Sequence, residues 1–100
     1  MPSLTPKQRQ YLKAKAHALK PLLQVGKAGV TPALTEELDR VLEGHELVKV
    51  KLNDNTFEDE AGVIAAFSAK VEGLIHVWTI GHTLLLYRPS RGRPTRYPLP

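Results

Sequence analysis

The sequence predicts a two-layer α/β fold, in which a mixed four-stranded sheet packs against three helices. Helix start signals precede apolar patterns of helical period, and short apolar or alternating runs lie between them. The expected order is helix, strand, helix, strand, helix, strand, strand. Strand–helix–strand units give parallel neighbours with right-handed crossovers, and the last two strands form an antiparallel hairpin. One hundred residues suffice for one domain with a single core.

The first helix has clear boundaries in the sequence. Thr5-Pro6-Lys7-Gln8 is typical of a capping box with proline in the first helical turn. Pro21 cannot continue a helix, so the helix is expected to run to about Leu19. One stripe of this helix is basic, because basic residues recur every three or four positions along it. The residues of this stripe, which we predict to contact phosphate groups, are Arg9, Lys13, His17 and Lys20.

A short loop framed by two glycines is the feature around which we expect a binding site. It follows a short strand at 22–25 and reads Gly26-Lys27-Ala28-Gly29. Thr31 and Pro32, just after it, suit an N-cap and a first helical residue. Backbone N–H groups in such a loop receive anions, helped by the helix dipole, and Lys27 adds a mobile positive charge. A tight turn with a solvated lysine is the alternative interpretation of the loop alone.

The remaining elements follow from periodicity and turn residues. The second helix is expected to stop at Gly44, the third to be capped by Asn55, and Gly81-His82 to form a two-residue hairpin turn. The strand at 46–52 alternates, which predicts a single buried face. The expected ranges are 32–43 and 57–72 for the helices and 46–52, 74–80 and 84–88 for the strands.

The charges are segregated along the chain. Residues 1–35 hold six basic residues and no acid, residues 36–72 hold all ten acids, and residues 73–100 hold four arginines and no acid. If the two ends meet in space, the molecule has one basic side, which is the usual footprint of a phosphate-binding protein. Arg88 is expected to join this side. Residues 90–100, rich in proline and arginine, are expected to form a flexible basic tail.

Several side chains have two interpretations. Trp78, in the middle of a strand, is expected in the core, although a flat aromatic beside lysines also suits the stacking of a base. Lys49 and Lys51 lie on the less apolar side of their strand, where lysines either contact RNA or cover a sheet edge. His17 suits an RNA contact and a buried, hydrogen-bonded histidine equally well.

The composition excludes several classes of protein. The chain has no cysteine, which excludes disulfides and thiolate metal sites and fits a reducing compartment. No apolar run approaches the roughly 20 residues of a membrane span, and no signal-like run begins the chain. We therefore expect a cytoplasmic protein that uses no membrane, metal or cofactor, and a monomer is favoured.

Three blocks of residues carry a family resemblance. The first runs from Lys7 to Thr31 and includes Leu19-Lys20-Pro21 and the glycine loop. The second spans residues 46–51, and the third joins Ile80-Gly81 to the run from Leu86 to Pro89. With these blocks in this order, the chain resembles the CRM domain, the RNA-binding family of chloroplast splicing factors and bacterial YhbY-like proteins. The resemblance covers the chain from about Leu4 to Pro89, so a single CRM-like domain is expected over residues 1–89.

The resemblance implies a fold like the C-terminal domain of bacterial translation initiation factor three. It also implies non-catalytic RNA binding through Gly26, Lys27, Ala28 and Gly29 and the neighbouring basic residues. Ala28 departs from the asparagine that is common in the family, which removes one possible hydrogen bond to RNA. Free-standing members of this length are associated with precursors of the large ribosomal subunit, which implies precursor ribosomal RNA and ribosomal proteins as partners.

Two other functions stay open at this point. The acidic region 36–72 suits an adaptor that binds a basic ribosomal protein. A small hydrolase would need acid–base groups, which four histidines and these acids supply in principle. No catalytic motif of suitable spacing supports the hydrolase, and the RNA-binding interpretation is preferred.

Overall fold

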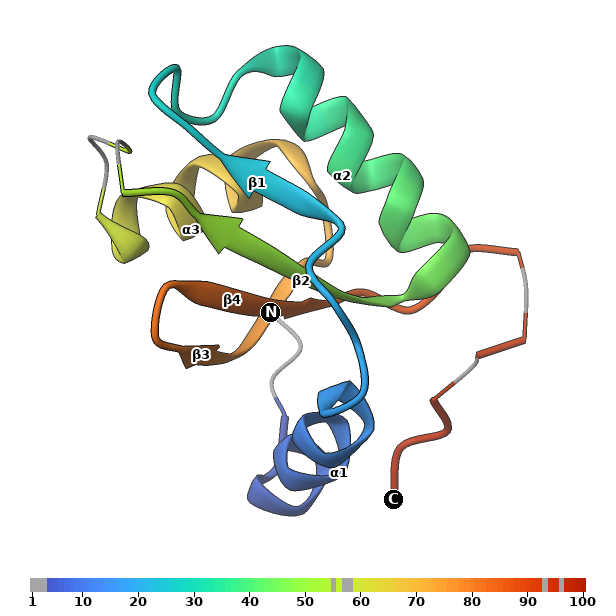
Figure 1. The fold of residues 1–100 in the computed structure, drawn as a ribbon. Helices are drawn as coiled ribbons and strands as arrows, with labels where there is room; N and C mark the ends of the chain where they lie inside the picture. Colours follow the sequence, from blue (N-terminus) through green and yellow to red (C-terminus); the bar gives the residue numbers. More distant parts are fainter. Residues whose placement is uncertain (1–3, 55, 57–58, 93, 96) are drawn as a thin grey trace.

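The computed structural model describes residues 4–54, 56, 59–92, 94–95 and 97–100 of the chain. Its elements appear in the predicted order, and the predicted α/β fold is confirmed (Figure 1). The helices and strands are α1 (Pro6–Ala16), β1 (Leu23–Val25), α2 (Pro32–His45), β2 (Leu47–Leu52), α3 (Glu60–Lys70), β3 (Ile75–Ile80) and β4 (Thr83–Tyr87).

The four strands form one mixed sheet in the order β1-β2-β4-β3. β1 lies parallel to β2, and β4 lies antiparallel to both of its neighbours. Ile80 pairs with Thr83 across the predicted two-residue turn, where Gly81 has a φ of 58°. A glycine at this first central position is what a type II′ hairpin turn requires. The pairing of β3 with β4 is irregular between His76 and Trp78, so β3 carries a bulge there.

Helices cover both faces of the sheet (Figure 1). α2 and α3 cover one face, where the larger core includes Leu38, Leu42 and Phe67. α1 lies against part of the opposite face, where a second core forms between its Leu12 and Ala16 and strand residues of β2, β3 and β4. The sheet and the layer of α2 and α3 are the two predicted layers. α1, on the opposite face of the sheet, forms a third layer.

The position of α1 corrects the prediction of a single buried face on β2. Val48, Val50 and Leu52 do face α2 and α3 as expected, but Leu47 on the other face is also buried, under α1. Farther along the same face Lys49 is half-buried and Lys51 is exposed. The face is therefore covered at one end of the strand and open at the other.

The start of α1 and of α2 is as predicted, whereas their ends differ. Thr5 and Gln8 form the complete capping box of α1. α1 ends at Ala16 rather than Leu19, because the chain turns there through hydrogen bonds to the carbonyls of Ala14 and Ala16. α2 continues through Gly44 to His45, and Glu46, with a φ of 63°, ends it instead.

α3 is shorter than predicted. It begins at Glu60, where the Asp59 side chain accepts a hydrogen bond of 2.8 Å from the Gly62 N–H and caps the helix. It ends at Lys70, because Val71 has an extended backbone and turns into the core. The predicted cap Asn55 and first residue at 57 lie outside the described residues. No helix in the described part of the chain is long and apolar enough to cross a membrane.

The C-terminal segment folds back along the domain. The Ser90 hydroxyl donates to the Glu43 carbonyl at 2.6 Å, and the Thr95 hydroxyl donates to the buried Glu46 carboxylate at 2.7 Å. Tyr97 and Leu99 then pack against the core under α1. These contacts give the segment a defined path in the structure, and its flexibility stays a prediction.

Candidate nucleic-acid interface

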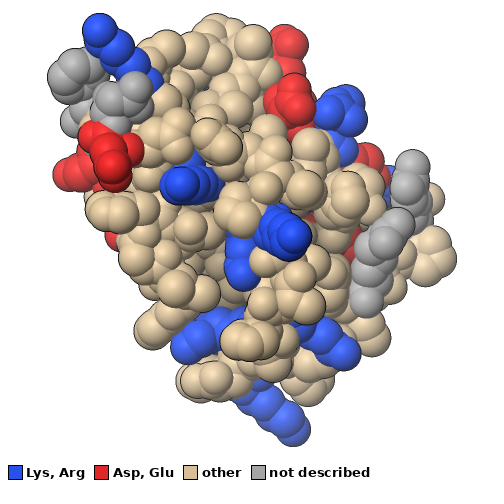
Figure 2. All heavy atoms as spheres, viewed as in Figure 1, with Lys and Arg blue, Asp and Glu red and all other residues tan. Residues whose placement is uncertain are grey.

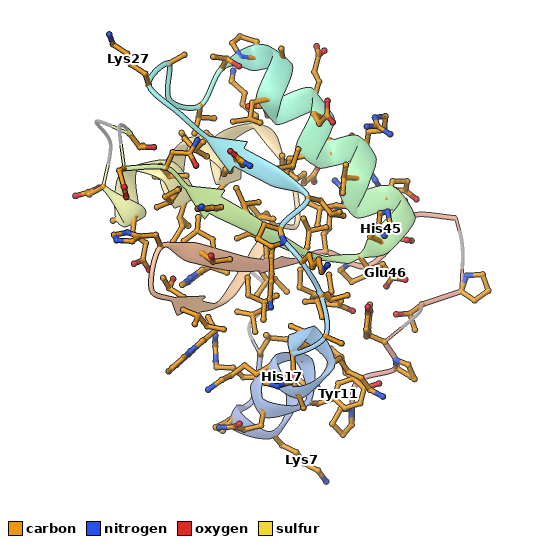
Figure 3. All side chains as sticks on the ribbon, in the orientation of Figure 1. Lys7, Tyr11, His17, Lys27, His45 and Glu46 are labelled. Atoms are coloured by element: carbon orange, nitrogen blue, oxygen red, sulfur yellow. The ribbon has the colours of Figure 1, made fainter. Side chains whose placement is uncertain are left out.

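The glycine loop lies at the end of β1 and leads into α2. The Gly29 N–H donates to the Gly26 carbonyl at 3.0 Å, which closes a tight turn with Lys27 and Ala28 at its exposed tip. The Lys27 side chain extends away from the body of the protein (Figure 3). Within the described ranges, the N–H groups of Lys27 and Ala28 have no hydrogen-bond acceptor in the protein. The turn therefore offers two amides and one ammonium group to an anion.

The two glycines of this loop have different physical roles. Gly29 has a φ of 70°, a conformation that side chains with a Cβ disfavour, whereas Gly26 has no positive φ. A Cβ on Gly26 would lie 3.8 Å from the Asn53 side-chain nitrogen, an ordinary contact distance. The positive φ at position 29 thus favours glycine there, whereas position 26 has room for a side chain and its glycine leaves the surface of the loop open.

We expect Gly29→Ala to lower the free energy of unfolding by about 1 kcal/mol, because alanine pays the left-handed backbone penalty. Gly26→Ala, the matched control in the same loop, is expected to leave it nearly unchanged. Urea unfolding followed by circular dichroism measures both. Equal losses in the two variants would contradict the assignment of backbone strain to Gly29 alone.

The first helix does not lie beside the loop. Lys27 is at one end of the molecule and Lys7 and His17 are at the other (Figure 3). Because α1 lies away from the loop, it does not continue a phosphate track directly from the loop. Phosphate contacts by its basic stripe stay a prediction. The members of this stripe separate: His17 and Lys20 are exposed, while Arg9 is half-buried and donates to the backbone carbonyls of His76 and Val77. Arg9 fastens α1 to β3 because a guanidinium group satisfies two carbonyls at once.

An exposed part of the sheet joins the two ends. One row of paired residues crosses all four strands on the α1 side, beyond the reach of that helix. The row consists of Gln24, Lys51, Thr83 and Ile80. We call this row, together with Lys49 and Trp78 beside it, the open sheet face. Figure 2 shows lysine and arginine side chains spread over this side of the molecule, with the acidic groups toward its rims. The basic surface thus includes the sheet itself. For Lys49 and Lys51, this position is compatible with RNA contact, which was one of their two interpretations from the sequence.

Trp78 is exposed, which corrects its predicted place in the core. Trp78 is 43% exposed, and Ile80 is 55% exposed. Because of the bulge in β3, Val77 occupies the buried position under α1, and Trp78 lies beyond the helix opposite Leu85. The Lys13 ammonium group lies 3.6 Å from the centre of the Trp78 ring, a cation–π contact. Lys49 donates to the Leu19 carbonyl at 2.9 Å and so is tied to the segment after α1.

Arg88 is buried, which corrects its predicted place on the basic surface. Its side chain is 3% exposed and forms ion pairs with Asp39 and Glu43 of α2. It also donates to the Asp39 carbonyl at 3.1 Å, so it ties the end of β4 to α2. Arg91 pairs with the same two carboxylates at 3.0 and 3.4 Å. Part of the acidic middle region is therefore neutralised within the molecule.

A polar cluster on the opposite side of β3 contains the histidine nearest to a carboxylate in the described residues. His76 Nε2 lies 2.7 Å from the Thr79 hydroxyl, which donates to Glu60 at 2.5 Å. Burial lowers the pKa of His76 below 6.5, with Glu60 opposing the shift and Arg9 adding to it. The ring is therefore neutral at neutral pH, and the cluster fastens β3 to α3. Among the described residues, no group of three or more His, Cys, Asp or Glu side chains is placed to hold a metal ion.

Comparison with known proteins agrees with this fold. A family model of the CRS1 / YhbY (CRM) domain matches residues 4–88. An RNA-binding protein of Haemophilus influenzae is 38% identical over 98 residues, 98% of either chain. The probable RNA-binding protein YqeI of Bacillus subtilis is 40% identical over 88 residues, which are 88% of this chain and 91% of the relative.

A solved structure shares the whole architecture. The solution structure of the hypothetical protein SAV1595 of Staphylococcus aureus, described as a candidate RNA-binding protein, superposes with a TM-score of 0.78 at 33% identity. The match covers 98% of this chain and 100% of the other. The sequence blocks, the mixed sheet with helices on both faces and the match over residues 4–88 agree, and the chain belongs to the CRS1 / YhbY (CRM) domain family.

Proposed function

We propose that the protein is a non-catalytic RNA-binding protein that grips structured RNA with its glycine loop and open sheet face. The observation that carries the proposal is the exposed turn at Gly26–Gly29, at one end of a lysine-bearing sheet. Within the described residues its Lys27 and Ala28 N–H groups have no acceptor, and the Lys27 side chain points outward (Figure 3). Phosphate groups are the natural partners of such a surface. The relatives named above are described as RNA-binding proteins, which supports RNA over other polyanions.

The proposed RNA is precursor ribosomal RNA of the large subunit, bound in the cytoplasm during assembly of that subunit. This part of the proposal depends on the family resemblance, since charge and loop geometry favour any RNA. RNA binding of this kind needs no catalytic group. Arg9 and His76 are polar side chains that lie near each other, but both form hydrogen bonds that hold β3 in place.

The test compares binding to large-subunit ribosomal RNA fragments and to duplex DNA of equal length across a salt series. We expect a preference for the RNA fragments. We expect Lys27→Ala to reduce the slope of log affinity against log salt by about 0.7–0.9, the loss of one phosphate contact. Gly26→Asp, which places a carboxylate in the loop, is expected to abolish binding.

Lys70→Ala is the control, since Lys70 is an exposed lysine at the end of α3, on the opposite side of the sheet. It is expected to change neither affinity nor slope. Equal binding of RNA and DNA, or unchanged binding by folded Lys27→Ala and Gly26→Asp proteins, would overturn the proposal.

A protein-binding adaptor is the second candidate function, favoured by a groove between α2 and α3. The groove has a volume of about 800 Å³. Its lining combines small apolar residues, such as Ala66, with the acids Glu36 and Glu72 and the basic residues Lys70 and Arg91. The two glutamates suit a basic group of a protein segment that lies in this groove. A ribosomal protein that stays bound after nuclease treatment, and is released by Glu36→Lys, would favour the adaptor.

A further inference from the structure

The large exposed hydrophobic residues in the described part of the chain border the open sheet face at its two edges. They are Leu22, Trp78 and Ile80, with exposed fractions of 52%, 43% and 55%. Ile80 belongs to the row across the sheet, Trp78 lies beside it, and the Leu22 N–H bonds to the Lys49 carbonyl at the opposite edge. An indole exposed in this way on a small protein suggests a surface that contacts a partner.

The side chains around Trp78 are basic, and this charge indicates which class of partner the surface binds. None of the four strands contains an acidic residue. Lys13 contacts the indole directly, and Lys51 is exposed on the same face of the sheet. Lys49, on the same strand as Lys51, pairs with Leu85 of β4, which in turn pairs with Trp78. An apolar protein partner would have to bury these ammonium groups without counter-charges, at a large cost in desolvation. A nucleotide offers a flat base for the ring and a phosphate for the lysines together.

Only an unpaired base fits this geometry. In an RNA duplex the bases are stacked inside the helix, and side chains cannot enter the deep, narrow major groove. In a single strand each base presents an open π-face, and stacking on an aromatic side chain is possible for all four bases. The open sheet face therefore suits an unpaired segment that continues from a region held by the glycine loop.

We propose that the open sheet face binds unpaired RNA nucleotides, with one base stacked on the Trp78 indole. The proposal rests on the proposed RNA-binding function and names the part of the RNA that this face takes. Lys13 leaves the ring and pairs with an adjacent phosphate, so the cation–π contact is exchanged for stacking and an ion pair. Stacking on an aromatic ring is the stronger of the two ring contacts at an exposed site.

The experiment uses the fluorescence of Trp78, which is the single tryptophan of the chain. The protein is titrated with a ten-nucleotide uridine RNA and, separately, with a fully paired RNA of ten base pairs. We expect the single strand to quench and shift the emission, and the duplex to leave it unchanged. Trp78→Ala is expected to weaken single-strand binding by about 5- to 150-fold, the range for loss of one stacked base. Trp78→Phe, which keeps a ring, is expected to stay within a few-fold of the wild type.

The salt dependence of binding distinguishes the loss of base stacking from the loss of a phosphate contact. Trp78→Ala is expected to leave the salt slope unchanged, whereas Lys27→Ala flattens it. If Trp78→Ala binds the single strand as the wild type does and emission is unaffected, the stacking proposal is wrong, while a Lys27→Ala effect keeps the proposed function intact. If the wild-type protein binds neither of these RNAs nor the large-subunit ribosomal RNA fragments, the proposed function itself fails. A dimer in sedimentation that Trp78→Ala dissociates, without change in RNA binding, would assign the face to a second copy of the chain and overturn the proposal.

Discussion

Arg88→Ala is expected to lower the free energy of unfolding by about 3 kcal/mol and to leave the RNA affinity of the folded protein unchanged. The arginine is almost fully buried and joins two carboxylates and a backbone carbonyl of α2 to the end of β4. Removing one partner of a buried ion pair typically costs about 3–5 kcal/mol. The lower end applies here, because the side chains of Asp39 and Glu43 are 46% and 30% exposed and regain water.

Arg88→Lys is the matched variant, since it keeps the charge and loses the two-armed geometry. A lysine ammonium group cannot bind two carboxylates and a carbonyl in one plane, so an intermediate loss of stability is expected. Urea unfolding gives the free energies, and RNA titration at a temperature where all variants are folded gives the affinities. If the Arg88→Ala protein were as stable as the wild type but bound RNA more weakly, Arg88 would belong to the RNA-binding surface after all.

Reversal of two charges on the proposed RNA surface is expected to have a large effect on binding. Lys27→Glu with Lys51→Glu should weaken RNA binding about 100-fold near physiological salt, because each lost charged contact is worth about 1.5 kcal/mol at an exposed site. The salt slope should fall by about 1.4–1.8, the sum for two phosphate contacts. Both lysines are exposed, so thermal unfolding should change little.

The control carries the same change of net charge on the other side of the sheet. Arg40→Glu with Lys70→Glu reverses two exposed residues of α2 and α3, and the ion pair of Arg40 with Glu37 is itself exposed. Exposed pairs of this kind contribute little to stability. Similar losses of affinity in the two double variants would mean that net charge, and no particular surface, governs binding.

Local signals predicted the starts of α1 and α2. The capping box at Thr5 and the Thr31 cap depend on hydrogen bonds within three residues, which the sequence alone specifies. The loop between Gly26 and Gly29 was predicted for the same reason. The end of α2 was not, because Glu46 adopts a positive φ only in the context of its buried carboxylate and the C-terminal segment.

Tertiary placement explains the errors at the site. Periodicity shows that a helix has an apolar stripe but not which face of the sheet it covers, so the distance of α1 from the loop was not predictable. Segregated charges suggested a basic side, and yet Arg88 and Arg91 pair with acids of α2 that are distant in sequence. Trp78 was assigned to the core because it lies in the middle of a strand, whereas a bulge and the short length of α1 leave it exposed.

The small size of the domain limits how much RNA one molecule shields. No principal dimension of the chain exceeds 37 Å. Successive phosphates along one strand of a double helix advance about 3 Å along its axis, so a single copy spans about a dozen of them. A footprint in chemical probing of bound ribosomal RNA should therefore stay within about one helical turn. Protection over a longer continuous stretch would indicate that several copies bind side by side.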